Sequence, residues 1–185
     1  FACSMSGLSL NVLLVEKSPL KSVSKPKPDG REIALTHHSR KILIKLGVWA
    51  LIDEAKVSPL KEAKVFDGDS DSLLNFDAKK SAIEALGYLV PNHLIRAALF
   101  ERVSQAENVT ILNEIIVDGV STSNKGAEVS LSNGRTIKSK LVVAADSRFS
   151  EIRRKMGIPS IMKDFSKVMI TTRMSHEKAH NHIAL

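Results

Sequence analysis

The sequence is poor in aromatic residues and in cysteine. Its 185 residues include one Trp, one Tyr and six Phe, and Cys3 is the single cysteine. One cysteine excludes an internal disulfide framework and a structural zinc cluster, and it favours a reducing compartment. The scarcity of aromatic rings argues against nucleic-acid-binding folds that stack bases on them. No apolar run approaches about 18 residues, so the sequence predicts no membrane-spanning helix.

Acidic residues are outnumbered by basic ones. The sequence has 27 Lys and Arg against 20 Asp and Glu, which gives a net charge of +7. A basic balance favours anionic partners such as nucleotide phosphates, nucleic acid or an acidic membrane surface. Because the positive residues are spread along the chain, a module for binding nucleic acid or membrane is the weaker alternative. The length allows one domain, or one domain and part of another.

Neither end of the sequence has the pattern of a complete fold. Residues 1–6 lack the basic n-region of a signal peptide. Followed by Gly7, they predict the last turns of a helix. Residues 167–174 predict a strand, and the sequence stops soon afterwards. The ends therefore predict that the sequence begins and stops within structural elements, with short, frayed termini as the alternative.

Short strands and amphipathic helices alternate along the chain. Proline- and lysine-rich residues 18–30 predict a loop, and Gly47 either interrupts a helix or marks its end. The periodicity predicts helices at 39–52, 92–103 and 149–156. It predicts strands at 11–16, 62–66, 73–76, 109–112, 115–120, 127–131, 135–137 and 141–145, with turns at 68–72 and 132–134. This pattern favours an α/β fold with an inserted antiparallel layer.

Glu16 ends the first predicted strand. A hydrophobic strand that ends in an acid, after a helix of small residues, is typical of the second half of a βαβ dinucleotide-binding unit. In such units the carboxylate accepts hydrogen bonds from the adenosine ribose. The G-x-G-x-x-G loop of the unit is expected about 20 residues upstream, and no such motif occurs in this sequence. The alternative is that Glu16 only marks where a strand reaches solvent.

Two further places offer groups for a nucleotide. Asp29-Gly30-Arg31 combines a turn with a guanidinium that can clamp a pyrophosphate, although a solvated loop arginine is the alternative. Asp146 lies at a predicted strand-to-helix junction, where free amides and the helix dipole favour anions. It could accept a ribose or ribityl hydroxyl, or Asp146 or Ser147 could be only an N-cap.

The histidines near the C-terminus match the letters of a zinc motif. His176 to His180 reads H-E-x-x-H, which on a helix places two imidazoles on one face. The preceding residues predict a strand and no third ligand is evident, so we predict no metal site.

Together, these segments resemble the ubiquinone-biosynthesis branch of the para-hydroxybenzoate hydroxylase-like, FAD-dependent aromatic monooxygenases. The resemblance covers nearly the whole chain. Its matching segments run in order: VLLVEK (12–17), DGREIALTHHSRKILIKLGVW (29–49), LGYLVPNHLIRAAL (86–99), VTIL (109–112), LVVAADSRFSEIRRKMGI (141–158) and HEKAHNHIAL (176–185).

The resemblance implies an α/β architecture made of two parts. Residues 1–160 would form an incomplete Rossmann-like FAD-binding domain with an antiparallel β insertion, the meander near 109–139. Residues 161–185 would start a substrate-binding sheet, to which 62–90 also contribute.

The resemblance also implies a reaction. NAD(P)H would reduce FAD, and the reduced flavin would use O₂ to hydroxylate the ring of a polyprenylated phenol. The implied location is cytoplasmic, compatible with peripheral contact at the inner membrane face or with a ubiquinone-biosynthesis complex, and no nucleic acid is expected.

Six residues acquire cofactor-binding roles by resemblance. Glu16, with Lys17 beside it, would bind the adenosine ribose of FAD. Arg31 lies in the segment that contacts the flavin nucleotide, and Asn92, as the N-cap of a helix, would lie on the phosphate side.

The other two roles fall in the second half of the chain. The backbone near Val117 would border the adenine, and Asp146 belongs to an A-D-G motif that serves FAD and the nicotinamide cofactor. Here Ser147 stands where the motif has glycine. A glycine there would permit close approach to the backbone or a positive φ. No catalytic side chain is predicted.

The family's glycine loop is not found in this sequence, and its downstream G-D motif, which contacts the FAD ribityl chain, would lie beyond residue 185. We therefore expect that this chain alone does not hold FAD stably. The alternative function is a non-catalytic fragment of such an enzyme, from a split or decayed gene.

Overall fold

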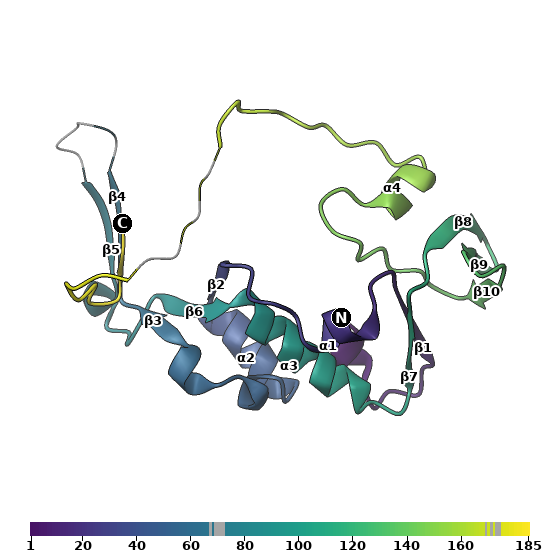
Figure 1. Ribbon diagram of the computed structural model, residues 1–185, viewed down its shortest axis with the longest axis horizontal. Coiled ribbons are helices and arrows are strands. Elements are labelled where there is room, and N and C mark those ends of the chain that lie inside the picture. Colours follow the sequence, from purple (N-terminus) through teal and green to yellow (C-terminus); the bar gives the residue numbers. More distant parts are fainter. Residues whose placement is uncertain (67, 69–72, 169, 171, 173–174) are drawn as a thin grey trace. The chain divides into compact units, whose positions relative to one another are not determined.

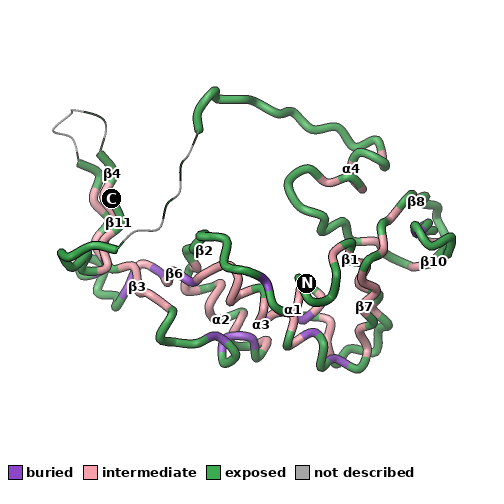
Figure 2. The backbone as a smooth tube through the Cα atoms, viewed as in Figure 1, coloured by how far each residue is buried: buried purple, intermediate pink, exposed green. Residues whose placement is uncertain are grey.

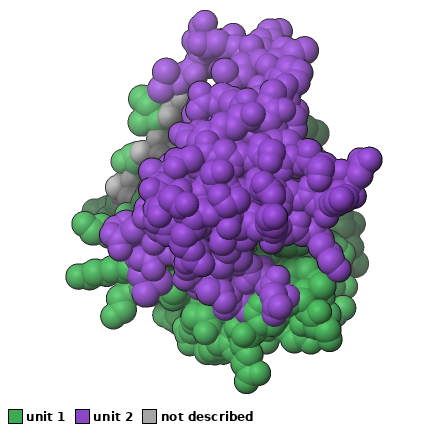
Figure 3. Space-filling model, turned by 90° about the vertical axis from the view of Figure 1, so that its right-hand side faces the viewer, with its two compact units in different colours: residues 1–10, 21–108, 170–185 green, residues 11–20, 109–169 purple. Residues whose placement is uncertain are grey.

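The computed structural model describes residues 1–66, 68, 73–168, 170, 172 and 175–185. Their contacts divide the chain into two units, coloured separately in Figure 3. Unit 1 comprises residues 1–10, 21–108 and 170–185, and unit 2 comprises 11–20 and 109–169. Each unit is described by itself. The predicted boundary near residue 160 stays a prediction.

Unit 1 mixes helices with two small sheets (Figure 1). Its helices are η1 (Ala2–Met5), α2 (His37–Lys45), η2 (Trp49–Leu51), η3 (Glu54–Lys56), η4 (Ala78–Ser81) and α3 (Asn92–Ser104). Its strands are β2 (Glu32–Leu35), β3 (Ser58–Leu60), β4 (Glu62–Phe66), β5 (Leu73–Asp77), β6 (Gly87–Pro91) and β11 (Ile183–Ala184). The short helix α1 (Leu20–Ser24) lies at the border between the units.

The sheet β2-β6-β3 positions the residues of interest in unit 1. β6 pairs with β2 and with β3, both antiparallel, and Glu32 faces Pro91 across the β2–β6 ladder. This register brings the residues just before β2 next to the start of α3. Gly87 permits the close approach of these strands, because a Cβ at this position would lie 2.6 Å from the Leu35 carbonyl oxygen.

Helix α2 is shorter than its hydrophobic pattern predicts. It begins after Thr36, whose hydroxyl accepts a hydrogen bond from the Ser39 amide at 3.1 Å. It ends at Lys45, and Gly47 follows with φ of 71°, the left-handed conformation that terminates a helix. The predicted continuation to residue 52 is therefore wrong, since η2 is a separate turn. Of the two predicted roles for Gly47, helix termination is the correct one.

The core of unit 1 lies where α2, η2 and β6 meet. Val48 and Val90 have no exposed surface, and the buried stretches of the chain are purple in Figure 2. Next to them, the Arg40 guanidinium carbon lies 5.0 Å from the Trp49 ring centroid and 4.6 Å from that of Tyr88. Cation–π contacts of this kind contribute about 0.5–2 kcal/mol each. The arginine thus ties α2 to β6.

Helix α3 packs beside α2 (Figure 1), and Arg102 Nε in α3 donates to the Leu46 carbonyl at 2.9 Å. The predicted helix at 92–103 is confirmed with nearly the same bounds. Its predicted N-cap is wrong, because Pro91 occupies the N-cap position and Asn92 is the first helical residue. The Asn92 side chain is instead used elsewhere, as described below.

The second sheet of unit 1 is β11-β4-β5. β4 and β5 form the predicted antiparallel hairpin, and β11 runs parallel to β4. The predicted turn at 68–72 lies, apart from Gly68, outside the described residues. The predicted strand at 167–174 also includes undescribed residues, and its described positions 167, 168, 170 and 172 are not in a strand.

Asn108 holds the N-terminal segment of unit 1. Its Nδ2 lies 2.8 Å from the Met5 carbonyl, 3.2 Å from that of Leu8 and 2.8 Å from that of Leu10. Its Oδ1 accepts from the Gly7 amide at 3.2 Å. One side chain therefore serves four backbone groups at the end of η1 and in the loop that follows it.

Unit 2 contains a parallel strand pair, a meander and a short helix. β1 (Val12–Glu16) pairs in parallel with β7 (Val109–Asn113), and β8 (Val117–Ser123), β9 (Gly126–Leu131) and β10 (Thr136–Ser139) form the predicted antiparallel meander. Helix α4 (Glu151–Lys155) follows. Buried Ala127, Val129 and Leu131 alternate along one face of β9.

Two expectations for unit 2 and its border are wrong. Residues 18–30 are not entirely loop, because α1 forms at Leu20–Ser24, between the prolines. Residues 141–145 are not a strand: Leu141 and Val143 are 73% and 49% exposed. A strand needs a neighbour to satisfy its amides and carbonyls, and among the described residues no strand pairs with this segment.

No helix in the described part of the chain is long and apolar enough to cross a bilayer.

Candidate functional site

Three polar side chains of unit 1 meet where the loop before β2 reaches the start of α3. Asp29 Oδ2 accepts from Arg31 Nε at 2.9 Å, from Arg31 Nη2 at 2.6 Å and from Asn92 Nδ2 at 2.7 Å. Asp29 Oδ1 accepts from the Arg31 amide at 3.2 Å. The site is therefore a carboxylate that gathers four donors from two residues.

The backbone brings these residues together. The Asn92 amide donates to the Arg31 carbonyl at 2.9 Å, which extends the β2–β6 ladder by one step. Asn92 is also the first residue of the 13-residue helix α3. The first amides of a helix lack intrahelical acceptors and carry positive partial charge, which favours anions.

The Asp29 carboxylate is ionised at neutral pH. Hydrogen bonds from Arg31 and, secondarily, from Asn92 lower the pKa of Asp29 from 3.8 to about 2. The Arg31 side chain is 61% exposed, so its guanidinium is held by Asp29 yet reachable from solvent. The arrangement suits an anionic group that approaches from outside.

Unit 2 places Glu16 at the carboxyl end of β1. Its Oε1 accepts from the Ser18 amide at 2.7 Å, and Asn113 of the parallel strand β7 lies in register beside it. Lys17 is exposed at the same end. In open parallel sheets, ligands bind outside the carboxyl ends of the strands. Glu16 thus lies at the carboxyl end of a parallel strand pair, and its ribose-binding role stays a prediction.

Asp146 serves the first turn of α4. Its Oδ2 accepts from the Ile152 amide at 3.0 Å, while Ser150 is the N-cap residue. Partial burial acts to raise the pKa of Asp146, but hydrogen bonds from the Ile152 amide and the Ser150 hydroxyl outweigh it and lower this pKa. The expectation that Asp146 or Ser147 is the N-cap is therefore wrong in detail, although Asp146 does bind a free helix amide.

Ser147 adopts φ of 74°. This is the left-handed region that glycine populates freely, and a non-glycine residue there is strained by about 1–3 kcal/mol. Of the two reasons for a glycine at this position, close approach or a positive φ, the positive φ is present here with serine.

Val117 begins β8, and its carbonyl accepts from Lys155 Nζ at 2.6 Å. Val117 and Asp146 therefore both contact α4. Among the described residues, no hydrogen bond or ion pair joins Glu16 to Asp146. The six predicted cofactor residues fall into separate groups, with Arg31 and Asn92 together in unit 1.

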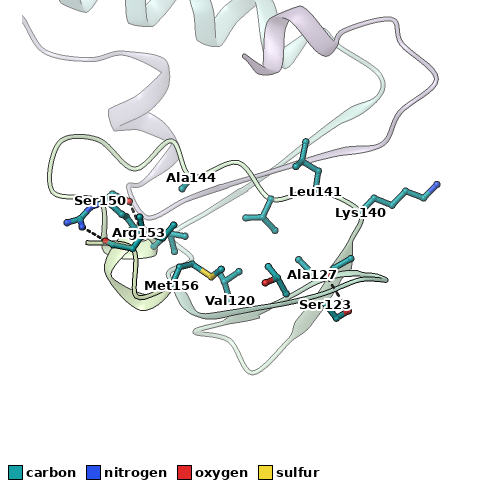
Figure 4. Close-up of a pocket in the computed structure, with 14 residues that line it drawn as sticks. Val120, Ser123, Ala127, Lys140, Leu141, Ala144, Ser150, Arg153 and Met156 are labelled. Carbon is teal, nitrogen blue, oxygen red and sulfur yellow. Dashed lines mark hydrogen bonds between the residues drawn. The ribbon is translucent and has the colours of Figure 1, made fainter. Parts of the chain in front are cut away.

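An open groove of about 540 Å³ lies in unit 2 between the meander and the segment around α4 (Figure 4). Apolar side chains such as Val120, Leu141 and Met156 line it, together with the cations Lys140 and Arg153. Neither Val117 nor Asp146 lines this groove, which therefore adds no evidence for their predicted roles.

The H-E-x-x-H letters fall at His176 to His180, near the C-terminus. Residues 176–180 are not helical, and within the described ranges no group of three or more His, Cys, Asp or Glu is arranged to hold a metal. His180 instead lies edge-on to His176 and His182, at centroid distances of 5.5 and 5.2 Å.

The sequence patterns missed two residues. The sequence pattern predicts a turn at Asp29 but no role for its carboxylate. The signal was present, because Asp-Gly-x commonly forms a turn in which the Asp oxygen accepts the amide two residues on. Asn108 gave no signal, since its partners are backbone groups that only the fold brings close.

Comparison with known proteins places these features in a family. No protein-family model matches the chain. The ubiquinone hydroxylase UbiM of Neisseria meningitidis is 46% identical over 188 residues, which cover all of this chain and 41% of that protein. The ubiquinone hydroxylase UbiL of Rhodospirillum rubrum is 27% identical, with 100% and 42% of the two chains covered.

The chain belongs to the ubiquinone hydroxylase family of FAD-dependent monooxygenases. A mitochondrial ubiquinone biosynthesis monooxygenase of Danio rerio is also similar, with 30% identity over 99% of this chain and 41% of that protein. The chain thus spans about two fifths of the length of these relatives.

Solved structures agree on the fold. A variant of PqsL of Pseudomonas aeruginosa superposes with a TM-score of 0.70 at 20% identity, over 88% of this chain and 43% of that one. The flavin-dependent monooxygenase PieE, solved with FAD and substrate, gives a TM-score of 0.64 at 18% identity, over 84% and 29%. The α/β fold expected from the resemblance is therefore confirmed as part of the FAD-dependent monooxygenase fold.

Proposed function

We propose that this chain supplies part of the flavin-nucleotide site of a monooxygenase that hydroxylates the aromatic ring of a polyprenylated phenol in ubiquinone biosynthesis. Family membership supports the reaction class. The observation within the chain that carries the proposal is the cluster at the start of α3, where Arg31 and the first-turn amides that follow the Asn92 amide offer positive charge to a phosphate.

The chemistry of the described residues fits FAD. Arg31 is a donor fork for phosphate oxygens, and the α3 amides add directed donors. In unit 2, the Glu16 carboxylate is an acceptor of the kind that ribose hydroxyls need, placed at the end of parallel strands. When bound, FAD supplies the redox chemistry, taking electrons from NAD(P)H and using O₂ as the oxygen donor.

The chain's own residues would bind and orient the cofactor. Arg31 and the first-turn amides of α3 that follow the Asn92 amide would neutralise phosphate charge. Asp146 stabilises the first turn of α4 through the Ile152 amide and holds the backbone that precedes it. The proposed partners are the phenol and O₂, and contact with the membrane surface is compatible because a polyprenyl tail resides in a bilayer. No nucleic acid is proposed.

A chimera tests this function. Residues 1–185 would replace the matching segment of the meningococcal ubiquinone hydroxylase, so that the remaining sequence is that of a known relative. We expect a yellow protein with flavin absorbance, and new ring-hydroxylated quinones, detected by mass spectrometry, in cells that lack their own hydroxylase. A folded chimera that stays colourless after soaking with FAD and forms no hydroxylated quinone would contradict the proposal.

The 185-residue chain by itself is the second protein to measure. Because it contains no G-x-G-x-x-G loop to cradle a pyrophosphate, we expect it to lose FAD on gel filtration. Loss of FAD from the chain alone, together with a colourless chimera, would support the alternative of a non-catalytic polypeptide.

A further inference from the structure

Asp29 links the two residues of unit 1 that the family resemblance assigns to FAD. Its carboxylate binds Arg31 through Nε and Nη2 and binds Asn92 through Nδ2, all on the single oxygen Oδ2. The other oxygen, Oδ1, binds the Arg31 amide. Nothing in the family resemblance gives Asp29 a role.

The contacts restrict one edge of the guanidinium and leave the other available. Arg31 Nη1 makes no hydrogen bond to the described residues, and the side chain is 61% exposed. A free arginine samples many rotamers, and ordering it on binding costs conformational entropy. A guanidinium already held through Nε and Nη2 has less of this entropy left to lose when a phosphate binds its remaining donors.

Asp29 also has an opposing effect. Its negative charge lies beside the place where an anion would bind, and like charges repel. Since the cluster is exposed, water and salt weaken this repulsion at the distance of a second ligand. Salt also weakens the exposed Arg31–Asp29 ion pair, but the two directed hydrogen bonds of 2.6 and 2.9 Å keep the geometry of the pair, and the contact to Asn92 has a neutral donor. Positioning is therefore expected to exceed repulsion.

We propose that Asp29 is a positioning residue of the flavin-nucleotide site, which holds the Arg31 guanidinium and the Asn92 amide in place for the phosphates. This inference rests on the function proposed above. It predicts that removal of the negative charge of Asp29 weakens the binding of an anion, whereas charge alone would predict tighter binding.

The first experiment measures FAD binding to the chimera by quenching of flavin fluorescence. We expect Asp29→Ala to weaken binding about tenfold through lost pre-organisation. Asp29→Asn, which keeps one acceptor oxygen, should give a smaller loss. In an Arg31→Ala background, Asp29→Ala should change binding by less than about twofold, because Asp29 acts through Arg31.

A matched control removes an exposed ion pair elsewhere. Glu128 lies 3.3 Å from Lys138 on the meander, and Glu128→Ala should leave FAD binding unchanged. Equal or tighter binding by Asp29→Ala would overturn the inference. So would an equal loss in the Arg31→Ala background, or a loss of the same size for Glu128→Ala, since either would indicate a general structural effect.

The second experiment uses the 185-residue chain itself and inorganic pyrophosphate, with NMR signals of Arg31 Nε–H and the Asn92 side-chain amide as the readout. We expect both signals to shift, and Asp29→Ala to need about tenfold more pyrophosphate for the same shift. Shifts at equal or lower pyrophosphate in Asp29→Ala would overturn the inference. A chimera that binds no FAD would refute the proposed function, while this NMR titration would still decide the role of Asp29.

Discussion

The replacement of Asn108 by alanine tests how the N-terminal segment of unit 1 is held. The substitution removes Nδ2, which serves the carbonyls of Met5, Leu8 and Leu10, and Oδ1, which serves the Gly7 amide. Because Nδ2 carries two hydrogens and faces three carbonyls, the four contacts correspond to about three full hydrogen bonds.

The expected loss follows from this geometry. A hydrogen bond contributes about 0.5–1.5 kcal/mol net, and partly exposed ones lie at the lower end because water replaces the lost partner. We therefore expect Asn108→Ala to lower the free energy of unfolding by about 2 kcal/mol. For a chain of this size the melting temperature should fall by about 4–8 °C.

Thermal unfolding followed by Trp49 fluorescence is a suitable assay, because Trp49 is the single tryptophan and lies in the core of unit 1. Asn133→Ala is the control, since Asn133 makes one exposed bond, to the Arg135 amide at 3.2 Å. It should change stability by less than about 0.5 kcal/mol. A shift for Asn108→Ala as small as that of the control would refute the reasoning.

A charged variant sharpens the test. Asn108→Asp keeps the shape but points a carboxylate at three carbonyl oxygens. At pH 7 it should therefore be less stable than Asn108→Ala. The folded-state pKa of the new carboxyl would be raised, so protonation favours folding, and stability should rise as the pH falls through that pKa. An Asn108→Asp protein whose stability does not rise on acidification would contradict the carbonyl arrangement.

Two further predictions follow from single positions. Gly87→Ala should destabilise unit 1 by about 1–3 kcal/mol, because the new Cβ would lie 2.6 Å from the Leu35 carbonyl oxygen. Gly119→Ala is the control, because the nearest atoms to its new Cβ are 3.9 Å away. Followed by circular dichroism, this control should unfold as the parent does. If the two variants melt alike, the close strand approach at Gly87 is refuted. The pKa of Asp29 is lowered to about 2, so the stability contributed by its ionised form is present above its ordinary pKa of 3.8 and is lost as the pH falls toward 2. A carbon-detected NMR titration should show this low pKa, and Arg31→Ala should return it toward 3.8; an unchanged pKa in that variant would mean that Arg31 is not its cause.

The elements that sequence patterns predicted well are those with local signals. The β8–β9–β10 meander follows alternating residues and a Ser-Asn-Gly turn, in which Gly134 adopts φ of 80°. Helix α3 follows a helical run after a proline. Each signal lies within a few residues of the structure that it predicts.

The elements that failed depend on distant partners or on local competition. The composition of 141–145 favours a strand, but a strand also needs a hydrogen-bonded neighbour, and the described part of the chain supplies none. Helix α1 was missed because prolines suggested a loop throughout 18–30. Pro19 lies just before the helix, where the missing amide of proline does no harm.

The candidate site was predictable only in part. Arg31 and Asn92 were named from resemblance to a family, and the structure brings them together through the register of β2 and β6. No local pattern could indicate that Asp29 binds both, because Asn92 lies 63 positions further along the chain. The roles of Glu16, Lys17, Val117 and Asp146 toward FAD remain predictions that binding measurements can test.

The parallel pairing of β1 with β7 has a consequence for how the protein folds during synthesis. Val12 pairs with Val109, and residues 21–108, the large middle segment of unit 1, separate the two strands along the sequence. β1 leaves the ribosome first and must wait for its partner, because closing so long a loop costs entropy until the intervening chain is ordered. Pairings this distant in sequence are slow, and apolar strands exposed in the meantime favour aggregation. We therefore expect the ordering of residues 21–108 to influence how long Glu16 and its strand stay unpaired in the nascent protein.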